Sequence, residues 1–422
     1  MKSLAQSLLN RFAALRPRGH GKETGGISVK GCADGTTEKT SQRREERQPE
    51  ESSYRTLQDL LRVRASSSHM RFLLCYPLGS TADSEPRKVS YATLYEEAKR
   101  NVQILEKLPN FHKHRPVLLH LEDHYDAIVW FWSVLLAGGV PVMSSPLSNV
   151  DEHRAKHLEA LASLLEGPIC ITRESSLALF QGGTHTLQPY TVESLQQLKA
   201  VKGGQAQALA QAVAGTVIAT NGGVPDGPSS IRNSPHAATG IKSSHNTRTS
   251  YAHTSDQQEA QATAALMLTS GSTGNAKAVR LRHSQMLAAA AGKMAMRAVP
   301  AEGAFLNWIG MDHVAALVET HLTALWLNLD QVHVHAPDVV ASPLLFMELL
   351  SRHRVSRTFA PNFFLAQLVT THRERKSDAS LASSLWDLSN LTALISGGEA
   401  NDIATVEAAT ALLGRYGPPP LT

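Results

Sequence analysis

A run of small and hydroxyl-bearing residues that ends in a lysine carries the clearest chemical signal in this sequence. Thr269 to Lys277 reads Thr-Ser-Gly-Ser-Thr-Gly-Asn-Ala-Lys and directly follows the apolar run Ala265 to Leu268. Glycines let the backbone wrap around an anion, hydroxyls add hydrogen-bond donors, and the lysine adds a positive charge. The composition suits a polyphosphate, and the alternative reading is a flexible Gly/Ser turn.

The run differs from the phosphate loop of P-loop NTPases. In that loop a glycine precedes the lysine and Ser or Thr follows it. Here Ala276 and Ala278 flank Lys277, so a P-loop NTPase is disfavoured. No G-x-S-x-G segment surrounds any serine of the sequence, which also disfavours an α/β-hydrolase.

Two histidines at strand spacing raise the question of a metal site. His333 and His335 would place two imidazoles on one face of a strand. No third ligand follows nearby, and structural zinc sites need four. The sequence therefore predicts no metal site.

These residues must be positioned by alternating helices and strands. Helical spacing of apolar residues around Leu57–Leu61 and Tyr91–Leu105 alternates with short apolar runs such as Val117–Leu119 and Pro168–Ile171. Such alternation is typical of βαβ units around a mostly parallel sheet. Further strands are expected after the phosphate-binding run, at Val332–Val334 and Leu391–Ile395.

The stretch from Ala127 to Met143 has no charged residue but does not resemble a membrane span. Polar or turn-forming residues interrupt it, namely Ser133, Gly138, Gly139 and Pro141. It also falls short of a comfortable span. We expect a buried helix that leads into a buried strand, with no membrane partner.

Compositional breaks divide the chain into four parts. Residues 1–53 form a basic segment that we expect to be disordered, because it has few apolar residues and ends in a charged run. Folded parts are expected at 54–201 and 263–422, separated by a flexible insertion at 202–262 that is rich in small and polar residues. Residues 1–22 hold five basic residues and no acidic one, so the alternative to a solvated tail is an organelle transit peptide.

The overall composition narrows the class of protein. Of the 422 residues, 42% are hydrophobic and 18% are charged, as in an ordinary globular chain. A net charge of +4 gives little reason to expect nucleic acid as a partner. Cys32, Cys75 and Cys170 lie far apart and form no even set, which favours a reducing compartment such as the cytoplasm.

The phosphate-binding run and three other segments together resemble the adenylate-forming superfamily, which includes acyl-CoA synthetases, peptide-synthetase adenylation domains and luciferases. The other segments are Val89–Tyr95, the Ala-Gly-Gly turn within Leu135–Val142, and Ile395-Ser-Gly-Gly-Glu399, and they occur in the family's order. The resemblance extends from about Tyr54 to Pro420. It implies an α/β fold, namely the large N-terminal domain of an adenylate-forming enzyme, with mostly parallel sheets flanked by helices.

Within that superfamily the sequence is most similar to adenylation domains of fungal secondary-metabolite synthetases and nonribosomal-peptide-synthetase-like enzymes. Asn307–Val314 and Phe359–Ala366 look like the segments that bind the carboxylate substrate there. The resemblance therefore implies substrate-binding roles for Trp308, His313, Asn362 and Phe363. The alternatives are that Trp308 and Phe363 belong to the core and that Asn362 opens a helix.

The resemblance also implies a reaction: a carboxylate attacks the α-phosphate of Mg–ATP, releases pyrophosphate and forms an acyl-adenylate. ATP and Mg²⁺ are thus the expected cofactors, and the ligase would activate an acyl, aryl or amino acid. Residues that resemble the family's phosphate-binding residues are Thr269, Ser270, Gly271, Ser272, Thr273, Gly274 and Lys277. Those that resemble its adenine- and acyl-contacting turn are Gly397, Gly398 and Glu399.

The sequence departs from the family pattern in two places. Ala276 stands where proline is usual. The family's Tyr/Phe-Gly-x-Thr-Glu segment, its ribose-binding aspartate and its catalytic lysine find no match, because Tyr416-Gly417 is followed by three prolines. We therefore expect a truncated adenylation domain of impaired activity, which could work with a carrier protein or a complementing synthetase chain. The alternative is an inactive module that binds a nucleotide or a partner.

Overall fold

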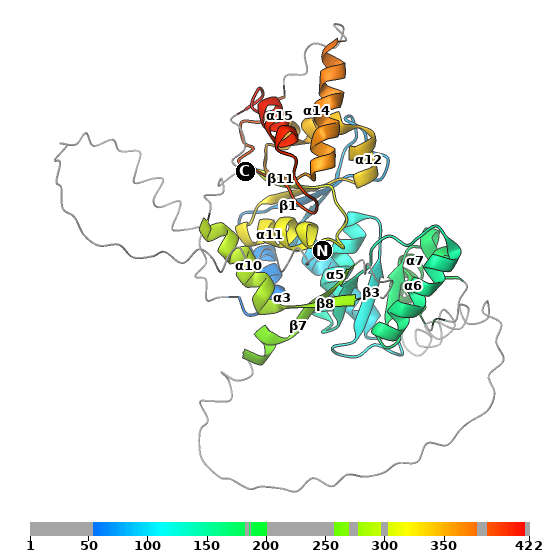
Figure 1. Ribbon diagram of the computed structural model, residues 1–422. Coiled ribbons are helices and arrows are strands. Elements are labelled where there is room, and N and C mark those ends of the chain that lie inside the picture. Colours follow the sequence, from blue (N-terminus) through cyan, green and yellow to red (C-terminus); the bar gives the residue numbers. More distant parts are fainter. Residues whose placement is uncertain are drawn as a thin grey trace, which may run out of the picture.

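The computed structural model describes residues 54–181, 185, 187–200, 257–269, 277–296, 303–377 and 386–417. Two mixed sheets with helices on their faces make up this part of the chain (Figure 1). Sheet A has six strands in the order β12-β11-β9-β10-β1-β2, and sheet B has six in the order β6-β5-β3-β4-β7-β8. Only the edge strands β2 and β8 run antiparallel to their neighbours among the described strands.

The strands are short, and most are buried. Sheet A comprises β1 (Phe72–Cys75), β2 (Arg87–Ser90), β9 (Ala304–Asn307), β10 (Asp330–His333), β11 (Val355–Phe359) and β12 (Ala393–Ile395). Sheet B comprises β3 (Pro116–His120), β4 (Val140–Met143), β5 (Ile169–Thr172), β6 (Gln188–Thr191), β7 (Thr263–Thr269) and β8 (Lys277–Arg282). Near-continuous apolar runs such as Val-Pro-Val-Met in β4 are typical of parallel strands covered on both faces.

Helices connect the strands. In the first part of the chain they are α3 (Leu57–Ala65), α4 (Tyr91–Leu105), α5 (His124–Leu136), α6 (Asp151–Leu164), the 3₁₀ helix η1 (Glu174–Phe180) and α7 (Val192–Ala200). In the second part they are α10 (His283–Met296), the π-helix η2 (Ala315–Leu322), α11 (Thr323–Leu327), α12 (Ala336–Ala341), α13 (Pro343–Arg352), α14 (Asn362–Ser377) and α15 (Ile403–Leu413). None of the helices in the described residues is long and apolar enough to cross a membrane.

The two folded parts expected at 54–201 and 263–422 do not correspond to the two sheets, because each sheet takes strands from both parts. Strands β1 and β2 come from residues before the expected insertion but pair in sheet A with β10, which comes from after it. Conversely, β7 and β8 follow the insertion but complete sheet B beside β4. The insertion at 202–262 lies outside the described residues except for its last six, and residues 257–261 are helical.

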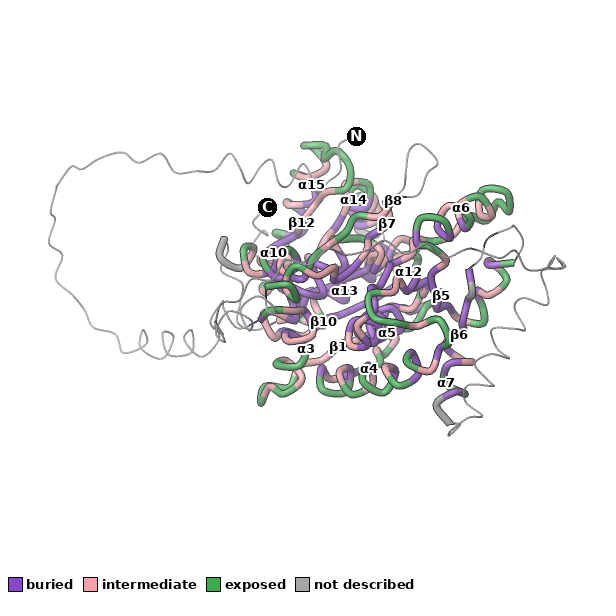
Figure 2. Tube along the Cα trace, turned by 90° about the horizontal axis from the view of Figure 1, so that it is seen from below, coloured by how far each residue is buried: buried purple, intermediate pink, exposed green. Residues whose placement is uncertain are grey.

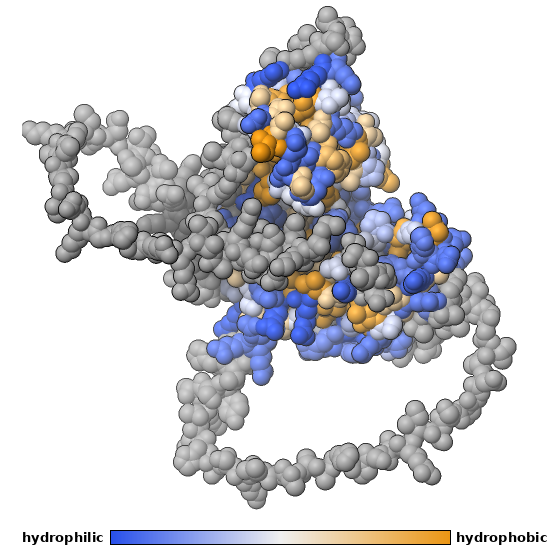
Figure 3. All heavy atoms as spheres, in the orientation of Figure 1, coloured by the Kyte–Doolittle hydropathy of each residue, from blue (hydrophilic) through white to orange (hydrophobic). Residues whose placement is uncertain are grey.

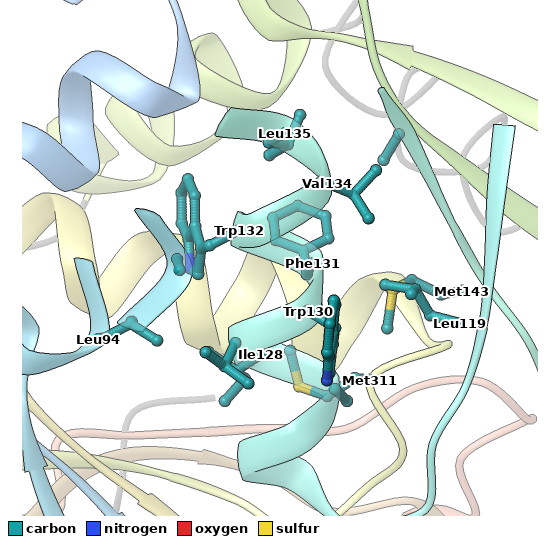
Figure 4. Close-up of a cluster of buried hydrophobic side chains, with 14 of the residues drawn as sticks. Leu94, Leu119, Ile128, Trp130, Phe131, Trp132, Val134, Leu135, Met143 and Met311 are labelled. Atoms are coloured by element: carbon teal, nitrogen blue, oxygen red, sulfur yellow. The ribbon is translucent and has the colours of Figure 1, made fainter. Parts of the chain in front are cut away.

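Helix α5 illustrates how the sequence determines the packing between the sheets. Its N-cap Asp123 accepts a hydrogen bond from the Asp126 backbone, and apolar residues then cover all sides of the helix. A helix that is apolar all round must be buried. Figure 4 shows Trp132 and Trp130 pointing to different sides of α5, with Met311 near Trp130. The expected buried helix followed by a buried strand is therefore confirmed as α5 and β4.

Two large apolar clusters hold the layers together. One surrounds α5 and extends to α3, α4, α10 and η2, and the other lies between sheet A and helices α13, α14 and α15. Figure 2 shows buried residues following the strands and α5, and exposed residues on the outer sides of α4 and α6. On the face shown in Figure 3, hydrophobic and hydrophilic residues are interspersed over α12, α14 and α15.

Candidate functional site

The carboxyl ends of four parallel strands meet at one edge of sheet A. Backbone hydrogen bonds link neighbouring ends there: the Ala360 amide donates to Ile395 at 2.9 Å, and the Val334 amide donates to Asn307 at 3.0 Å. Ligands of open α/β sheets bind outside the carboxyl ends of the strands. This edge carries both segments expected to bind the acid as well as the expected adenine-binding turn.

Two of those segments are hydrogen-bonded to each other. The Phe363 backbone amide donates to Glu399 Oε1 at 2.7 Å, and the Asp402 amide donates to Asn362 Oδ1 at 3.0 Å. Asn362 opens α14, so the Glu399 carboxylate lies at a helix N-terminus, where it satisfies an otherwise unpaired amide. The Asn362–Phe363 and Gly397–Glu399 segments thus form one structural unit.

The glycines of this unit leave its backbone open. Gly398 has φ of +88°, a conformation that residues with a side chain rarely adopt, and no atom lies within 4 Å of where its Cβ would be. A Cβ on Gly397 would lie 3.9 Å from the Phe359 ring. Exposed, glycine-lined backbone of this kind allows a flat ligand to approach closely.

The expected substrate-binding residues differ in exposure. Trp308 is buried, its ring centroid lies 4.6 Å from that of Phe364, and its Nε1 donates to the Phe359 carbonyl at 2.7 Å. It is a core residue that links β9 to β11. In contrast, 51% of Phe363 is exposed, so the alternative interpretation that Phe363 belongs to the core is wrong. As the second residue of α14 it points away from the apolar cluster that Phe364 enters.

His313 lies in the loop between β9 and η2. Its side chain is 66% exposed, and Nε2 lies 3.8 Å from Asp312 Oδ2, whose side chain is only 10% exposed. A Cβ on Gly310 would lie 2.2 Å from Asp312 Oδ1, so only glycine permits this carboxylate to fold back on the turn. The His313 imidazole is thus presented to solvent next to a carboxylate.

Strands β7 and β8 frame the expected phosphate-binding run. They form an antiparallel pair whose last partners are Thr269 and Lys277, and Thr269 Oγ1 donates to the Lys277 carbonyl at 3.4 Å. Lys277 is exposed at the start of β8. Between these partners the expected phosphate contacts lie outside the described residues, namely Ser270, Gly271, Ser272, Thr273 and Gly274.

Tyr416-Gly417 lies away from this edge of sheet A. The Leu388 amide donates to the Tyr416 carbonyl at 2.8 Å, and Leu388 precedes the amino end of β12. Gly397 follows the carboxyl end of the same strand. Tyr416-Gly417 therefore lies at the opposite end of β12 from the Gly397–Glu399 turn.

Sequence reasoning missed a buried polar network beneath the carboxyl edge. Gln331 Oε1 accepts from His321 Nδ1 at 2.8 Å and from His333 Nε2 at 3.1 Å. Trp132 Nε1 donates to His321 Nε2 at 2.9 Å, and Asn307 Nδ2 lies 3.4 Å from His333 Nδ1. Each ring therefore accepts a hydrogen bond on one nitrogen and donates from the other, which requires neutral imidazoles.

Burial explains why these imidazoles are neutral. It lowers the pKa of His321 to about 4 and that of His333 well below its ordinary value. His124, whose Nε2 donates to the Ile309 carbonyl at 3.0 Å, has its pKa lowered to about 4 by burial and by His335. No sequence signal marked His124 or His321, because single histidines in apolar helices show no pattern.

The same contacts give His333 and His335 roles other than metal binding. His333 belongs to the network around Gln331, while His335 Nε2 lies 3.7 Å from Asp123 Oδ2. Within the described ranges, no group of three or more His, Cys, Asp or Glu side chains is arranged to hold a metal ion.

Comparison with known proteins agrees with this geometry. The family described as AMP-binding enzyme matches residues 69–421. Nonribosomal peptide synthetase atrA of Aspergillus terreus is 38% identical over 368 residues, which cover 87% of this chain and 34% of that protein. Nonribosomal peptide synthetase acyN of Ascocoryne sarcoides is 37% identical over 365 residues, which cover 86% of this chain and 34% of that protein. This chain spans about a third of the length of these relatives.

Solved structures share the fold. The adenylation domain of a keto acid-selecting NRPS module bound to keto acyl adenylate has a TM-score of 0.64 at 24% identity, with 87% of this chain and 56% of that chain covered. McyG A-PCP complexed with phenylalanyl-adenylate has a TM-score of 0.60 at 24% identity, with 86% and 48% covered. The expected α/β fold with mostly parallel sheets is confirmed. On its match to residues 69–421 and its identity with fungal peptide synthetases, the chain belongs to the AMP-binding enzyme family.

Proposed function

We propose that this chain activates a carboxylic acid as its acyl-adenylate at the expense of ATP. The observation that carries the proposal is the unit formed by Asn362–Phe363 and Gly397–Glu399 at the carboxyl edge of sheet A. It joins the segment proposed for the acid to the segment proposed for adenine. In the reaction the acid's carboxylate oxygen bonds to the α-phosphorus, and the bond to the leaving pyrophosphate breaks.

The residues present fit a nucleoside triphosphate in two respects. Lys277 is exposed at the start of β8, and Gly397–Gly398 expose backbone beside the Phe359 ring. Lys277, together with the hydroxyls between it and Thr269, would hold the β- and γ-phosphates as they leave. Fixed donors are most effective where charge accumulates in the transition state. Mg²⁺ would enter as part of the Mg–ATP substrate and neutralise phosphate charge.

The acid would lie near His313, Phe363 and Asn362. His313 and Phe363 are the two exposed members of this set, and one offers a hydrogen-bonding ring while the other offers an apolar face. Trp308 would act from the core by fixing the Phe359 carbonyl. An apolar surface with a few polar groups is the usual make-up of a small-molecule site.

The cellular setting of the proposal follows from the relatives. Proteins whose names identify them as fungal nonribosomal peptide synthetases match this chain over about a third of their length. We therefore place the activation step in fungal secondary metabolism, with a carrier protein or a complementing synthetase chain as the partner that receives the acyl group.

Acid-dependent exchange of pyrophosphate into ATP tests the proposal. The 422-residue protein is incubated with Mg–ATP, labelled pyrophosphate and a panel of acyl, aryl, keto and amino acids. Exchange that one acid stimulates above the acid-free background supports activation, even at a rate far below that of a full-length relative. No stimulation by any acid contradicts it.

A second candidate is an inactive nucleotide-binding module. The position of Tyr416-Gly417 at the amino end of β12 favours it, because this pair then supplies no contact at the edge that carries Gly397–Glu399. This candidate predicts saturable ATP binding by calorimetry without acid-dependent exchange.

A further inference from the structure

One half-buried carboxylate joins three elements that lead to different parts of the proposed site. Glu319 of η2 accepts from Arg357 of β11 through Oε1 and pairs with Lys293 of α10 through Oε2. The three side chains are only 15%, 11% and 26% exposed, respectively. The Arg357 guanidinium also lies 5.7 Å from the centroid of the Phe305 ring on β9. Two positive charges and one negative charge therefore share a poorly solvated place.

Glu319, Arg357 and Lys293 form a charged triad, and the element that carries each of them adjoins a proposed binding segment or its strand. Helix α10 follows β8 directly, and β8 begins with Lys277. The π-helix η2 begins two residues after His313, and β11 ends three residues before Asn362. Glu319, itself on η2, thus links α10, which follows the strand of Lys277, to β11, which leads to Asn362.

Stability alone gives a weak reason for such a triad. Removing two charges from water costs free energy that their attraction seldom exceeds, and apolar residues of similar size often replace buried ion pairs without loss. Burial, and then the charge of Arg357, lower the pKa of the Lys293 ammonium to about 8, which shows how poorly this charge is solvated. What a buried ion pair does supply is a defined arrangement of the elements that carry it.

The helix that carries Glu319 needs such an arrangement. A π-helix is rare and is often found at functional sites. In η2 and just after it, Thr320 Oγ1 donates to the Ala315 carbonyl at 3.1 Å and Thr323 Oγ1 donates to the Val318 carbonyl at 2.8 Å. These contacts stabilise the wide turns but do not fix the helix against its neighbours. Glu319, near the middle of η2, provides polar contacts on both sides.

We propose that Glu319 is a positioning residue for acid activation, which holds η2 in register between α10 and β11 and thereby sets the acid relative to the triphosphate. This role depends on the proposed function. A displacement of about 1 Å between reacting groups can cost on the order of a hundredfold in rate, whereas the binding of each substrate by its own contacts changes little. The expected signature is therefore a loss in kcat with nearly constant KM.

Lys293→Met is the main test variant, because it leaves Glu319 paired with Arg357 and so leaves no buried charge uncompensated. We expect kcat for acid-dependent pyrophosphate exchange to fall at least tenfold, while KM for ATP and for the acid stays within threefold of wild type. Lys293→Arg restores the cation and should recover most of kcat. Glu319→Gln removes the shared acceptor charge and should lower kcat further, with thermal unfolding measured for every variant.

The outcomes separate the triad from the proposed function. If the wild type shows acid-dependent exchange and Lys293→Met has the same kcat and KM, the positioning role is overturned but the proposed function is not. A Lys293→Met variant whose kcat is normal but whose KM for ATP rises makes Lys293 a ligand contact and also overturns it. A kcat loss that Lys293→Arg does not recover assigns the effect to packing and counts against it. If no acid stimulates pyrophosphate exchange by the wild type, the proposed function fails, and the positioning role fails with it.

Discussion

Gly417 has no room for a side chain. A Cβ there would lie 2.5 Å from the backbone of Leu388, and that backbone cannot move without disturbing the hydrogen bond to Tyr416. Gly417→Ala should therefore lower the free energy of unfolding by about 1–3 kcal/mol, the usual cost of overpacking. Urea unfolding of the purified variant measures this change.

Gly292 provides the matched control. It lies inside α10, and nothing lies within 4 Å of where its Cβ would be. Gly292→Ala should stabilise the protein by about 0.5–1 kcal/mol, because alanine has the higher helix propensity. Equal stabilities of the two alanine variants would contradict the assigned packing around Gly417.

At the residue scale the sequence motifs indicated which segments lie together better than which side chains are exposed. Asn362 and Glu399 were expected in the site because their motifs are local, and the structure brings their segments together. Trp308 is buried, although the resemblance implies a substrate contact. The sequence does not distinguish a core tryptophan from a ligand-facing one when both lie in apolar segments. Glu319 was missed because its partners Lys293 and Arg357 are distant in sequence and meet only in the folded chain.

The polar network between α5, η2 and β10 makes stability depend on pH. His124 and His321 have pKa values of about 4 in the folded protein, below their ordinary value of 6.5, because they are buried. Between these two values the unfolded chain binds protons that the folded chain does not bind. Their contribution to stability is therefore fully present above about pH 6.5 and decreases as the pH falls toward 4.

The expected loss is large. A shift from 6.5 to about 4 corresponds to about 3 kcal/mol at most for each fully buried histidine. His120, His283 and His353 have pKa values lowered to about 4 by burial as well, so they add to the same effect. The free energy of unfolding, measured with urea from pH 7.5 to pH 5, should decrease as the pH falls. Its slope with pH should correspond to the binding of more than one proton on unfolding. A constant free energy of unfolding over this range would show that the network is protonated or solvated in the folded protein.

Element boundaries followed from local sequence where caps and apolar runs coincide. Ser90 caps α4, which begins at Tyr91 as the apolar spacing predicts. Helix α5 begins at His124, three residues before the expected apolar stretch, because Asp123 caps it there. The π-helical form of η2 was not predictable, because its apolar spacing is compatible with an ordinary helix. The pairing of β1 with β10 was equally hidden, since pairing between distant strands leaves no pattern in either one.

At the scale of the whole molecule, the expected insertion should be dispensable. Residues 202–256 show no apolar periodicity in sequence, and the free energy of closing a loop grows only slowly with its length. Replacing them with a short Gly/Ser linker while keeping the helical residues 257–261 should leave the melting temperature nearly unchanged. A loss of soluble protein would show that this segment packs on the folded part.

The interleaving of the two sheets gives this prediction a strict requirement. Strand β7 must still reach its place beside β4, because its pairing there completes the parallel part of sheet B. A linker too short to span that distance would prevent β7 from pairing with β4, whether or not the natural segment packs on the folded part. Two linker lengths should therefore be compared, and only a loss with both would contradict the prediction.

Calorimetric titration of ATP into wild type and Lys277→Ala tests the central claim most directly, with Arg280→Ala as a control for another exposed cation on β8. Removing one charge-assisted phosphate contact should cost on the order of 1.5–3 kcal/mol, or roughly ten- to over a hundredfold in affinity. We predict this loss for Lys277→Ala and an affinity within about threefold of wild type for Arg280→Ala. Equal ATP affinities for wild type and Lys277→Ala, or no ATP binding by wild type, would contradict a triphosphate site at the β7–β8 hairpin.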